Sequence, residues 1–257
     1  MNHPVVRMIL SDVDGTLIKK GKNSVPEDVF SAIRLAEKND IRFVIASGRS
    51  YFDLRTLFAP VSDSVCIIAD DGALAVQNNK ILYSSAIPKK NAEELLSVAR
   101  SAGADTAVLY GKNIAYTIGA ASDDIGFQKI FDISGMQDDI YKVAFFGATE
   151  FAKYKIRSYA KYSGKFTEIY ADKTWLEFVS VGTDKGTVCK FLQSAWNISS
   201  DETAAFGDNT NDFGMLRCAQ LTFSAPAAIP EIVSMCKYRT DNVLKEIIKL
   251  TQERGTL

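Results

Sequence analysis

Two aspartates lie directly after the first strongly apolar segment of the chain. The predicted strand Val5–Leu10 is followed by Asp12 and Asp14, and Gly15 comes next. Two carboxylates at the exit of a buried strand are unfavourable unless a cation lies between them. The glycine allows the tight backbone turn that would bring such a cation close. Asp12 is therefore a candidate metal ligand and also a candidate nucleophile.

Three further polar segments follow predicted strands or begin predicted helices. They are Ser47-Gly48-Arg49, Asp184-Lys185-Gly186 and Gly207–Asp212. In an open parallel sheet the carboxyl ends of the strands share one edge, and ligands bind there. Carboxylates suit magnesium, whereas lysine, hydroxyl and amide donors suit a phosphate group. The spacing therefore predicts a site for both at that edge.

The elements that must position these residues alternate between strands and helices at both ends of the chain. Such alternation predicts right-handed βαβ units and a parallel sheet. The predicted strands of these regions are Val5–Leu10, Ile41–Ala46, Val65–Ala69, Thr203–Phe206 and Leu221–Phe223, and the predicted helices include Pro26–Asn39, Tyr51–Phe58, Gly186–Trp196 and Asp212–Cys218.

The middle of the chain has a different rhythm. Short strands flank Gln77-Asn78-Asn79, which is typical of a hairpin. Strand pairs mixed with helices follow, one of these helices being predicted at Ser122–Phe131, and this mixture favours a largely antiparallel α+β unit. We therefore predict an α/β protein in which residues 1–83 and 184–257 form a Rossmann-like core and residues 84–183 form an inserted α+β domain.

The composition excludes several functional classes. The 257 residues carry 30 Lys and Arg against 31 Asp and Glu, a formal net charge of -1. This balance argues against nucleic acid or an anionic membrane as the main partner. His3 is the single histidine, so serine triads and histidine-rich zinc sites are excluded. The four cysteines form no CxxC pair, which predicts reduced thiols and a cytoplasmic protein.

Two hexapeptides carry a family resemblance. Asp12-Val13-Asp14-Gly15-Thr16-Leu17 and Gly207-Asp208-Asn209-Thr210-Asn211-Asp212, with Ser47 and Lys185 between them, resemble the signatures of the haloacid dehalogenase superfamily of phosphatases and phosphotransferases. The predicted insert resembles the α/β cap, of type IIB, in the Cof-like branch of that superfamily. The resemblance covers nearly the whole chain and implies Mg²⁺ as the cofactor.

The resemblance also implies a role for each matching residue. Asp12 would attack phosphorus and become an aspartyl phosphate, while Asp14 would protonate the leaving oxygen and then activate water. Ser47 and Lys185 would hold the phosphoryl oxygens. The implied metal site comprises Asp12, Asp14 through its carbonyl, Asp208 and Asp212, and the implied phosphate contacts include Val13, Gly15, Gly48, Arg49 and Asn211.

Some positions leave alternatives open. Arg49 would reach a substrate anion or pair with a carboxylate. Asn211 and Asp212 would support the site or cap the helix that follows them. Asp71 stands where the branch typically carries asparagine, and Ser47 where threonine is more frequent, so no substrate contact is inferred for the loop around Asp71.

The sequence thus predicts a magnesium-dependent phosphatase for a small phosphorylated metabolite, such as a sugar phosphate or a nucleotide-like phosphate. Three alternatives use the same residues. They are a phosphomutase with the same aspartate nucleophile, a response-regulator-like phosphoacceptor and a metabolite-binding protein without catalysis.

Overall fold

The computed structural model describes residues 5–119, 127–171, 173 and 175–254. They divide into two compact units. The first contains the residues up to Arg49, the segment Asp53–Tyr83 and the residues from Asp184 onward. The second contains Ser50–Phe52 and the described part of Ser84–Thr183. Each unit has its own sheet and its own apolar core.

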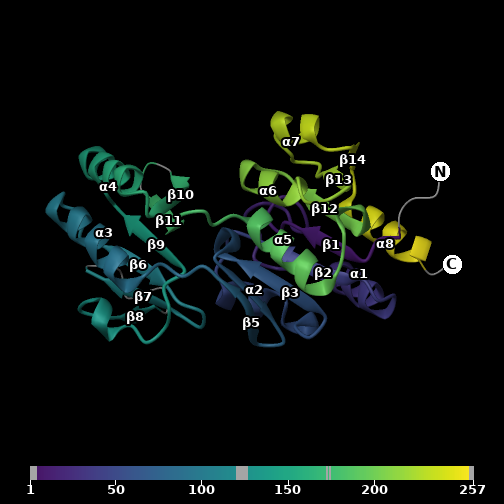
Figure 1. The fold of residues 1–257 in the computed structure, drawn as a ribbon, viewed down its shortest axis with the longest axis horizontal. Coiled ribbons are helices and arrows are strands. Elements are labelled where there is room, and N and C mark those ends of the chain that lie inside the picture. The colour runs from purple at the N-terminus through teal and green to yellow at the C-terminus, as the bar shows by residue number, and fades with distance from the viewer. Residues whose placement is uncertain (1–4, 120–126, 172, 174, 255–257) are drawn as a thin grey trace. The chain divides into compact units, whose positions relative to one another are not determined.

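The first unit is built on an eight-stranded sheet in the order β14-β13-β12-β1-β2-β3-β4-β5 (Figure 1). From β14 to β3 all neighbouring strands are parallel, and β4 is antiparallel to β3. The predicted parallel sheet is thus confirmed. The strands are β1 Met8–Ser11, β2 Arg42–Ala46, β3 Val65–Ala69, β4 Leu74–Gln77, β5 Lys80–Ser84, β12 Thr203–Gly207, β13 Leu221–Ser224 and β14 Tyr238–Arg239.

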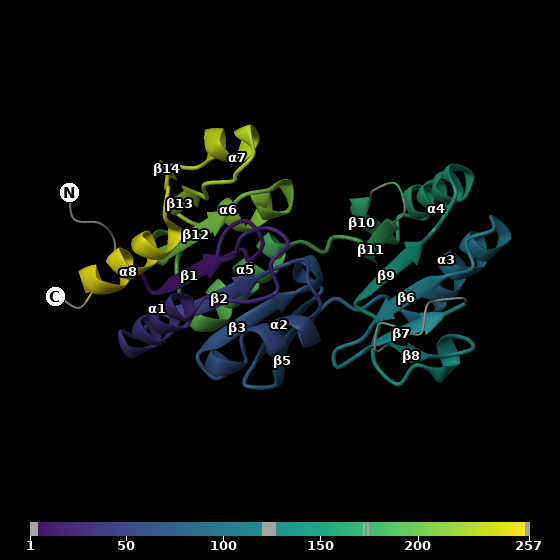
Figure 2. The same cartoon turned by 180° about the vertical axis from the view of Figure 1, so that it is seen from behind.

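Helices cover both faces of this sheet (Figures 1 and 2). Val188 and Leu192 of α5 pack with Met215 of α6 and Ile232 of α7 against alternate residues of the central strands, including Leu10. Helices α1 and α8 contact each other, and α1 also contacts β2. The helices associated with this sheet are α1 Glu27–Lys38, α2 Tyr51–Leu57, α5 Lys185–Trp196, α6 Phe213–Leu216, α7 Pro230–Met235 and α8 Val243–Arg254.

The hairpin predicted around residues 77–79 is present between β4 and β5. Asn78 and Asn79 have φ angles of 49° and 60°. Two consecutive positive φ angles are what a type I′ turn requires, and asparagine tolerates them better than most residues. The strand pairing here follows from local turn chemistry.

The second unit has a six-stranded sheet in the order β10-β11-β9-β6-β7-β8. It is antiparallel except for the β7–β8 pair, which confirms the predicted α+β character. Phe145 and Phe178 on one face of the sheet share an apolar core with Leu95 of α3 and Ile156 of α4. The elements are β6 Ala107–Tyr110, β7 Ala115–Ile118, β8 Gln128–Lys129, β9 Lys142–Phe146, β10 Phe166–Ala171, β11 Trp175–Ser180, α3 Lys89–Ser101 and α4 Glu150–Ser163.

One predicted helix is corrected. The first part of the prediction Ser122–Phe131 lies outside the described residues, and Gln128–Lys129 forms strand β8. These two residues pair with Tyr116 and Thr117 of β7. The neighbouring strand supplies hydrogen bonds for this backbone, so tertiary pairing overrides the local helical pattern.

Two other expectations concern the chain as a whole. No helix in the described part of the chain is both long and apolar enough to cross a membrane. All four cysteines are free, as predicted, and Cys66, Cys189 and Cys218 are buried. The cytoplasmic location inferred from the cysteines stays a prediction.

Gly72 provides a test of this fold. Its φ angle is +105°, and an added Cβ would lie 2.5 Å from the carbonyl carbon of Asp184 and 3.0 Å from the amide nitrogen of Lys185. We expect Gly72→Ala to lower the free energy of unfolding by about 2–4 kcal/mol in urea titrations. Gly21→Ala is the matched control, since Gly21 also has a positive φ angle but open space around it, and it should cost only about 1 kcal/mol. Equal losses would contradict the close approach.

Candidate active site

Residues of the predicted site in the first unit directly follow strands that are parallel neighbours in its sheet, which Figure 1 labels. Asp12 directly follows β1, Ser47 follows β2 and Asp208 follows β12. From β1 the chain continues to β2 on one side, and β12 lies on the other. Such a switch point, where connections leave in opposite directions, is where open α/β sheets bind ligands.

Lys185 is the centre of the site. It is the first residue of α5, has no solvent-exposed surface, and donates from Nζ to Oδ1 of Asp12 at 2.8 Å and to Oδ1 of Asp212 at 2.7 Å. Asp184 caps the helix by accepting from the amides of Gly186 and Thr187. The buried ammonium of Lys185 therefore lies at the positive end of the helix dipole. A positive charge buried there is unfavourable unless carboxylates pair with it.

Asp212 is held by hydrogen bonds within the protein, and its predicted part in the metal site stays a prediction. Its Oδ1 binds Lys185, and its Oδ2 accepts from the backbone amides of Asp208 at 2.9 Å and Asn209 at 3.1 Å. Both oxygens are therefore engaged within the protein. Asp212 orients Lys185 and the loop that carries Asp208, and Asn209 caps the short helix Thr210–Asp212.

Three carboxylates nevertheless lie close enough to share an ion. One oxygen from each of Asp12, Asp208 and Asp212 lies within 4.8 Å of the others. Burial raises the pKa of Asp12 to about 8 although Lys185 opposes the shift, and burial followed by repulsion from Asp212 raises the pKa of Asp208 to about 6. One lysine cannot neutralise three carboxylates, so the site lacks positive charge.

The donor set fits a divalent ion bound by oxygen. Asp12 is 5% exposed, and its Oδ2 is buried with no hydrogen-bond partner among the described residues. A buried carboxylate oxygen without a partner is unfavourable, and magnesium prefers such ligands. Asp12 and Asp208 are the residues that would hold Mg²⁺, with Asp212 supporting both through its hydrogen bonds.

Gly15 keeps this cluster tight. Its φ angle is +99°, and a Cβ there would lie 2.9 Å from Cγ of Asp208. Its amide donates to the carbonyl of Ile18 at 2.7 Å, and the phosphate contact implied for Gly15 stays a prediction. The role of Gly15 in the structure is to let the Asp208 carboxylate approach the turn after β1.

Arg49 binds Asp14. Its Nε donates to Oδ2 of Asp14 and its Nη2 to Oδ1, each at 2.6 Å. Hydrogen bonding to Asp14 is the main cause that raises the pKa of Arg49. Of the two predicted alternatives for Arg49, the structure shows pairing with a carboxylate. Asp14 therefore accepts a bidentate, charge-assisted contact from Arg49.

Ser47 and Asn211, two further residues of the predicted phosphate site, form hydrogen bonds within the protein. Oγ of Ser47 accepts from the amide of Arg49 at 3.2 Å, as at a helix entry. Asn211 donates from Nδ2 to Oδ1 of Asp71 at 2.8 Å. Sequence reasoning left Asp71 without a role, yet the signal that found the other residues applies to it too, since its turn directly follows β3.

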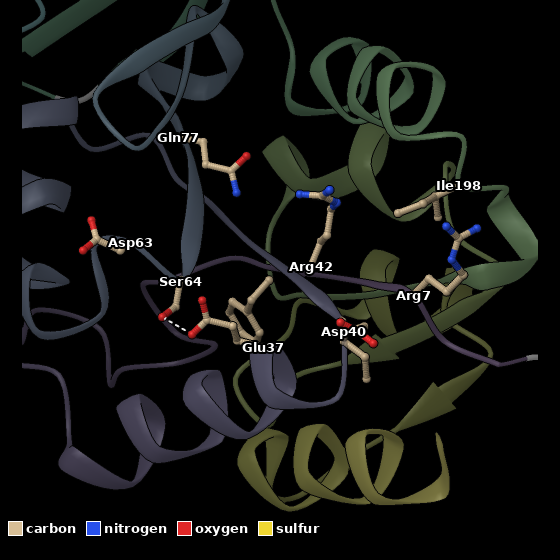
Figure 3. Close-up of a pocket in the computed structure, with 10 residues that line it drawn as sticks. Arg7, Glu37, Asp40, Arg42, Asp63, Ser64, Gln77 and Ile198 are labelled. Carbon is tan, nitrogen blue, oxygen red and sulfur yellow. Dashed lines mark hydrogen bonds between the residues drawn. The ribbon is translucent and has the colours of Figure 1, made fainter. Parts of the chain in front are cut away.

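A separate cavity lies at the opposite edge of this sheet (Figure 3). Arg7 precedes β1, Arg42 begins β2, and Gln77 ends the antiparallel β4, so these lining residues mark the amino ends of the parallel strands. Glu37 and Ser64, which are joined by a hydrogen bond, also line it. None of the predicted site residues lines this cavity.

Comparison with known proteins identifies the family. Residues 9–246 match the family model of the haloacid dehalogenase-like hydrolases. The chain belongs to this family. It is 22% identical to the 5-amino-6-(5-phospho-D-ribitylamino)uracil phosphatase YbjI of Escherichia coli strain K12, over 94% of this chain and 93% of that protein. It is 27% identical to the phosphatase YwpJ of Bacillus subtilis, over 83% and 87% of the respective chains.

Solved structures share the fold of this chain. A haloacid dehalogenase-like hydrolase from Bacteroides thetaiotaomicron superposes with a TM-score of 0.84, covering 95% of this chain and 99% of that one at 19% identity. That likeness supports the fold. The family resemblance, the fold class of a Rossmann-like core with a cap, and the prediction of a phosphatase enzyme are confirmed.

The raised pKa values predict how metal binding depends on pH. Folding raises the carboxyl pKa of Asp208 and Asp12 from 3.8 to about 6 and about 8, so the folded state binds these protons more tightly than the unfolded chain does. The metal-free protein should therefore lose stability as pH rises from about 4 to 8. Mg²⁺ competes with the same protons, so it should raise the melting temperature more at pH 8 than at pH 5.

Thermal melts with Mg²⁺ or with a chelator at the two pH values measure this difference. Asp208→Asn should largely remove the Mg²⁺-induced shift, whereas Asp63→Asn, at the cavity on the opposite edge, should retain it. Equal shifts at both pH values would contradict the assignment.

Proposed function

We propose that this phosphatase is magnesium-dependent and hydrolyses small phosphorylated metabolites through an aspartyl phosphate on Asp12. The observation that carries the proposal is the different environment of the two oxygens of the Asp12 carboxylate. Lys185 holds its Oδ1 at 2.8 Å, while its buried Oδ2 has no hydrogen-bond partner among the described residues. An oriented carboxylate of this kind is suited to attack at phosphorus.

Charge repulsion is the main obstacle to that attack. A carboxylate that approaches a phosphate dianion in a poorly solvated site is repelled by several kcal/mol. Lys185 is fixed beside Asp12 before substrate arrives and would stabilise charge on the phosphoryl oxygens. Mg²⁺, when bound by Asp12 and Asp208, would supply the remaining positive charge and keep Asp12 ionised.

The first half of the reaction needs a proton donor, and the second half needs a proton acceptor. In the first, an Asp12 oxygen bonds to phosphorus as the ester oxygen leaves, and that oxygen needs a proton. In the second, water attacks the aspartyl phosphate and loses a proton, which releases inorganic phosphate and restores Asp12. Asp14 would serve both steps. Its bidentate contact with Arg49 orients it until substrate arrives.

The relatives support the substrate class. YbjI is named for a substrate whose phosphate lies on a ribityl chain, which is a phosphomonoester of a small metabolite. A phosphomonoester suits a site with one fixed ammonium and one divalent ion. Sugar phosphates and nucleotide-like phosphates are therefore the first substrates to test, with Mg²⁺ and with a chelator. Isomer formation without release of inorganic phosphate would instead indicate a phosphomutase.

Asp12→Asn tests the nucleophile. We expect it to lower kcat by at least about a thousandfold against the best substrate of the panel, because the amide cannot form the acyl phosphate. The fold should survive, since burial already raises the pKa of Asp12 and a neutral side chain suits the position. Phosphate-release assays and thermal melts measure the two effects, with Asp63→Asn as the control. Turnover near the wild-type rate would exclude Asp12 as the nucleophile.

Asp14→Asn tests whether Asp14 acts in both phosphorylation of Asp12 and hydrolysis of the aspartyl phosphate. The variant should retain part of the first phosphorylation, particularly with a good leaving group, but hydrolyse the intermediate very slowly. Rapid-quench experiments should show a burst of leaving group close to one per site, followed by slow turnover. Equal losses in the single-turnover and steady-state rates would contradict the dual role of Asp14.

A further inference from the structure

The turn after β3 brings a further carboxylate to the proposed phosphate site. Asp71 lies in the short helical turn Asp70–Gly72, is 7% exposed and has a φ angle of 54°. Its amide donates to the carbonyl of Ser47 at 3.1 Å, and the amide of Asp70 donates to the carbonyl of Arg49 at 2.9 Å. The backbone therefore fixes Asp71 against the loop that carries Ser47.

The side chain of Asp71 points into the same group of residues. Its Oδ1 accepts from Nδ2 of Asn211 at 2.8 Å. Its Oδ2 lies against Gly48, where an added Cβ would be 2.8 Å away. Asp71 thus joins the turn after β3 to two segments that are proposed to bind phosphate, Ser47–Arg49 and the loop with Asn211.

This carboxylate also acts on Lys185. After Asp12 and Asp212, Asp71 is the next contributor among the carboxylates that raise the pKa of Lys185. The negative charge that stabilises the ammonium also repels any other anion that binds close to it. Inorganic phosphate would be such an anion. Nothing in the proposed chemistry uses a carboxylate at this position.

We propose that Asp71 sets the affinity of the site for phosphate, its fixed negative charge weakening the binding of inorganic phosphate. This inference rests on the proposed function, since it takes Ser47, Lys185 and Asn211 as the phosphate-binding groups. Asp71 binds Asn211 through its side chain and Ser47 through its backbone, and it acts on Lys185 through its charge. It is a positioning and affinity-setting residue and forms no bond to the reacting atoms.

Asparagine is the substitution that isolates the charge. Asp71→Asn keeps an oxygen that accepts from Nδ2 of Asn211, and asparagine tolerates a positive φ angle at least as well as aspartate. Size and shape hardly change. Asp71→Gly also suits φ 54° and removes the charge by a second route. Asp63→Asn is the matched control, because it removes one negative charge from the same unit at the opposite edge of the sheet.

The experiment is calorimetric titration of inorganic phosphate into each protein at saturating Mg²⁺. We expect Asp71→Asn to lower the Kd for phosphate about tenfold, as removal of one nearby charge from a poorly solvated site implies. Asp71→Gly should shift the Kd in the same direction, and Asp63→Asn should leave it unchanged. A purely structural role for Asp71 predicts weaker binding and a lower melting temperature in both variants.

Each result decides the inference. A Kd for Asp71→Asn within twofold of the wild type, or higher, overturns it, as does failure of both Asp71 variants to fold. The proposed function fails separately, if the wild type hydrolyses none of the panel or Asp12→Asn retains full turnover. Tighter phosphate binding by both Asp71 variants, with the control unchanged, supports the inference.

Discussion

The site depends on one buried ammonium held between carboxylates. Lys185 has no exposed surface, and its charge is compensated by Asp12 and Asp212 at hydrogen-bond distance. Burial alone would lower the pKa of Lys185, but these aspartates outweigh that effect and the pKa is raised. Removing both partners would leave a charge buried without compensation, which is strongly destabilising. This network therefore links the start of α5 to the loops that follow β1 and β12.

The backbone around this network is shaped by glycine. Gly15, Gly48, Gly72 and Gly207 all lie where a Cβ would collide with an aspartate of the site or with the backbone of Asp184. The carboxylates can approach one another closely because no side chain separates the loops that carry them. Burial is the main cause that raises the carboxyl pKa of Asp12 and Asp208, and repulsion from Asp212 adds to it. A divalent ion would relieve both effects.

Three aspartates of the site make contacts that their positions in the sequence do not specify. Asp212 uses both oxygens inside the protein, Asp14 is engaged by a guanidinium, and Asp71 holds the amide of Asn211. The contacts of Asp14 and Asp71 join segments that lie far apart along the chain. The Asp212 carboxylate is shared between Lys185 and two backbone amides. Motif spacing can place such residues at one edge of a sheet, but it does not decide which carboxylate binds a lysine, an arginine, an amide or a metal.

The sequence alone determined the parallel sheet, because apolar strands alternate with amphipathic helices, and it determined that Asp12, Ser47 and Asp208 follow strands that end at one edge. It also determined the β4–β5 hairpin, through two asparagines that accept positive φ angles. Strand β8 was decided only in three dimensions, by its pairing with β7. The same holds for the pairing of Arg49 with Asp14 and of Asp71 with Asn211, because these contacts depend on loop geometry and on competition among charges that no local pattern records.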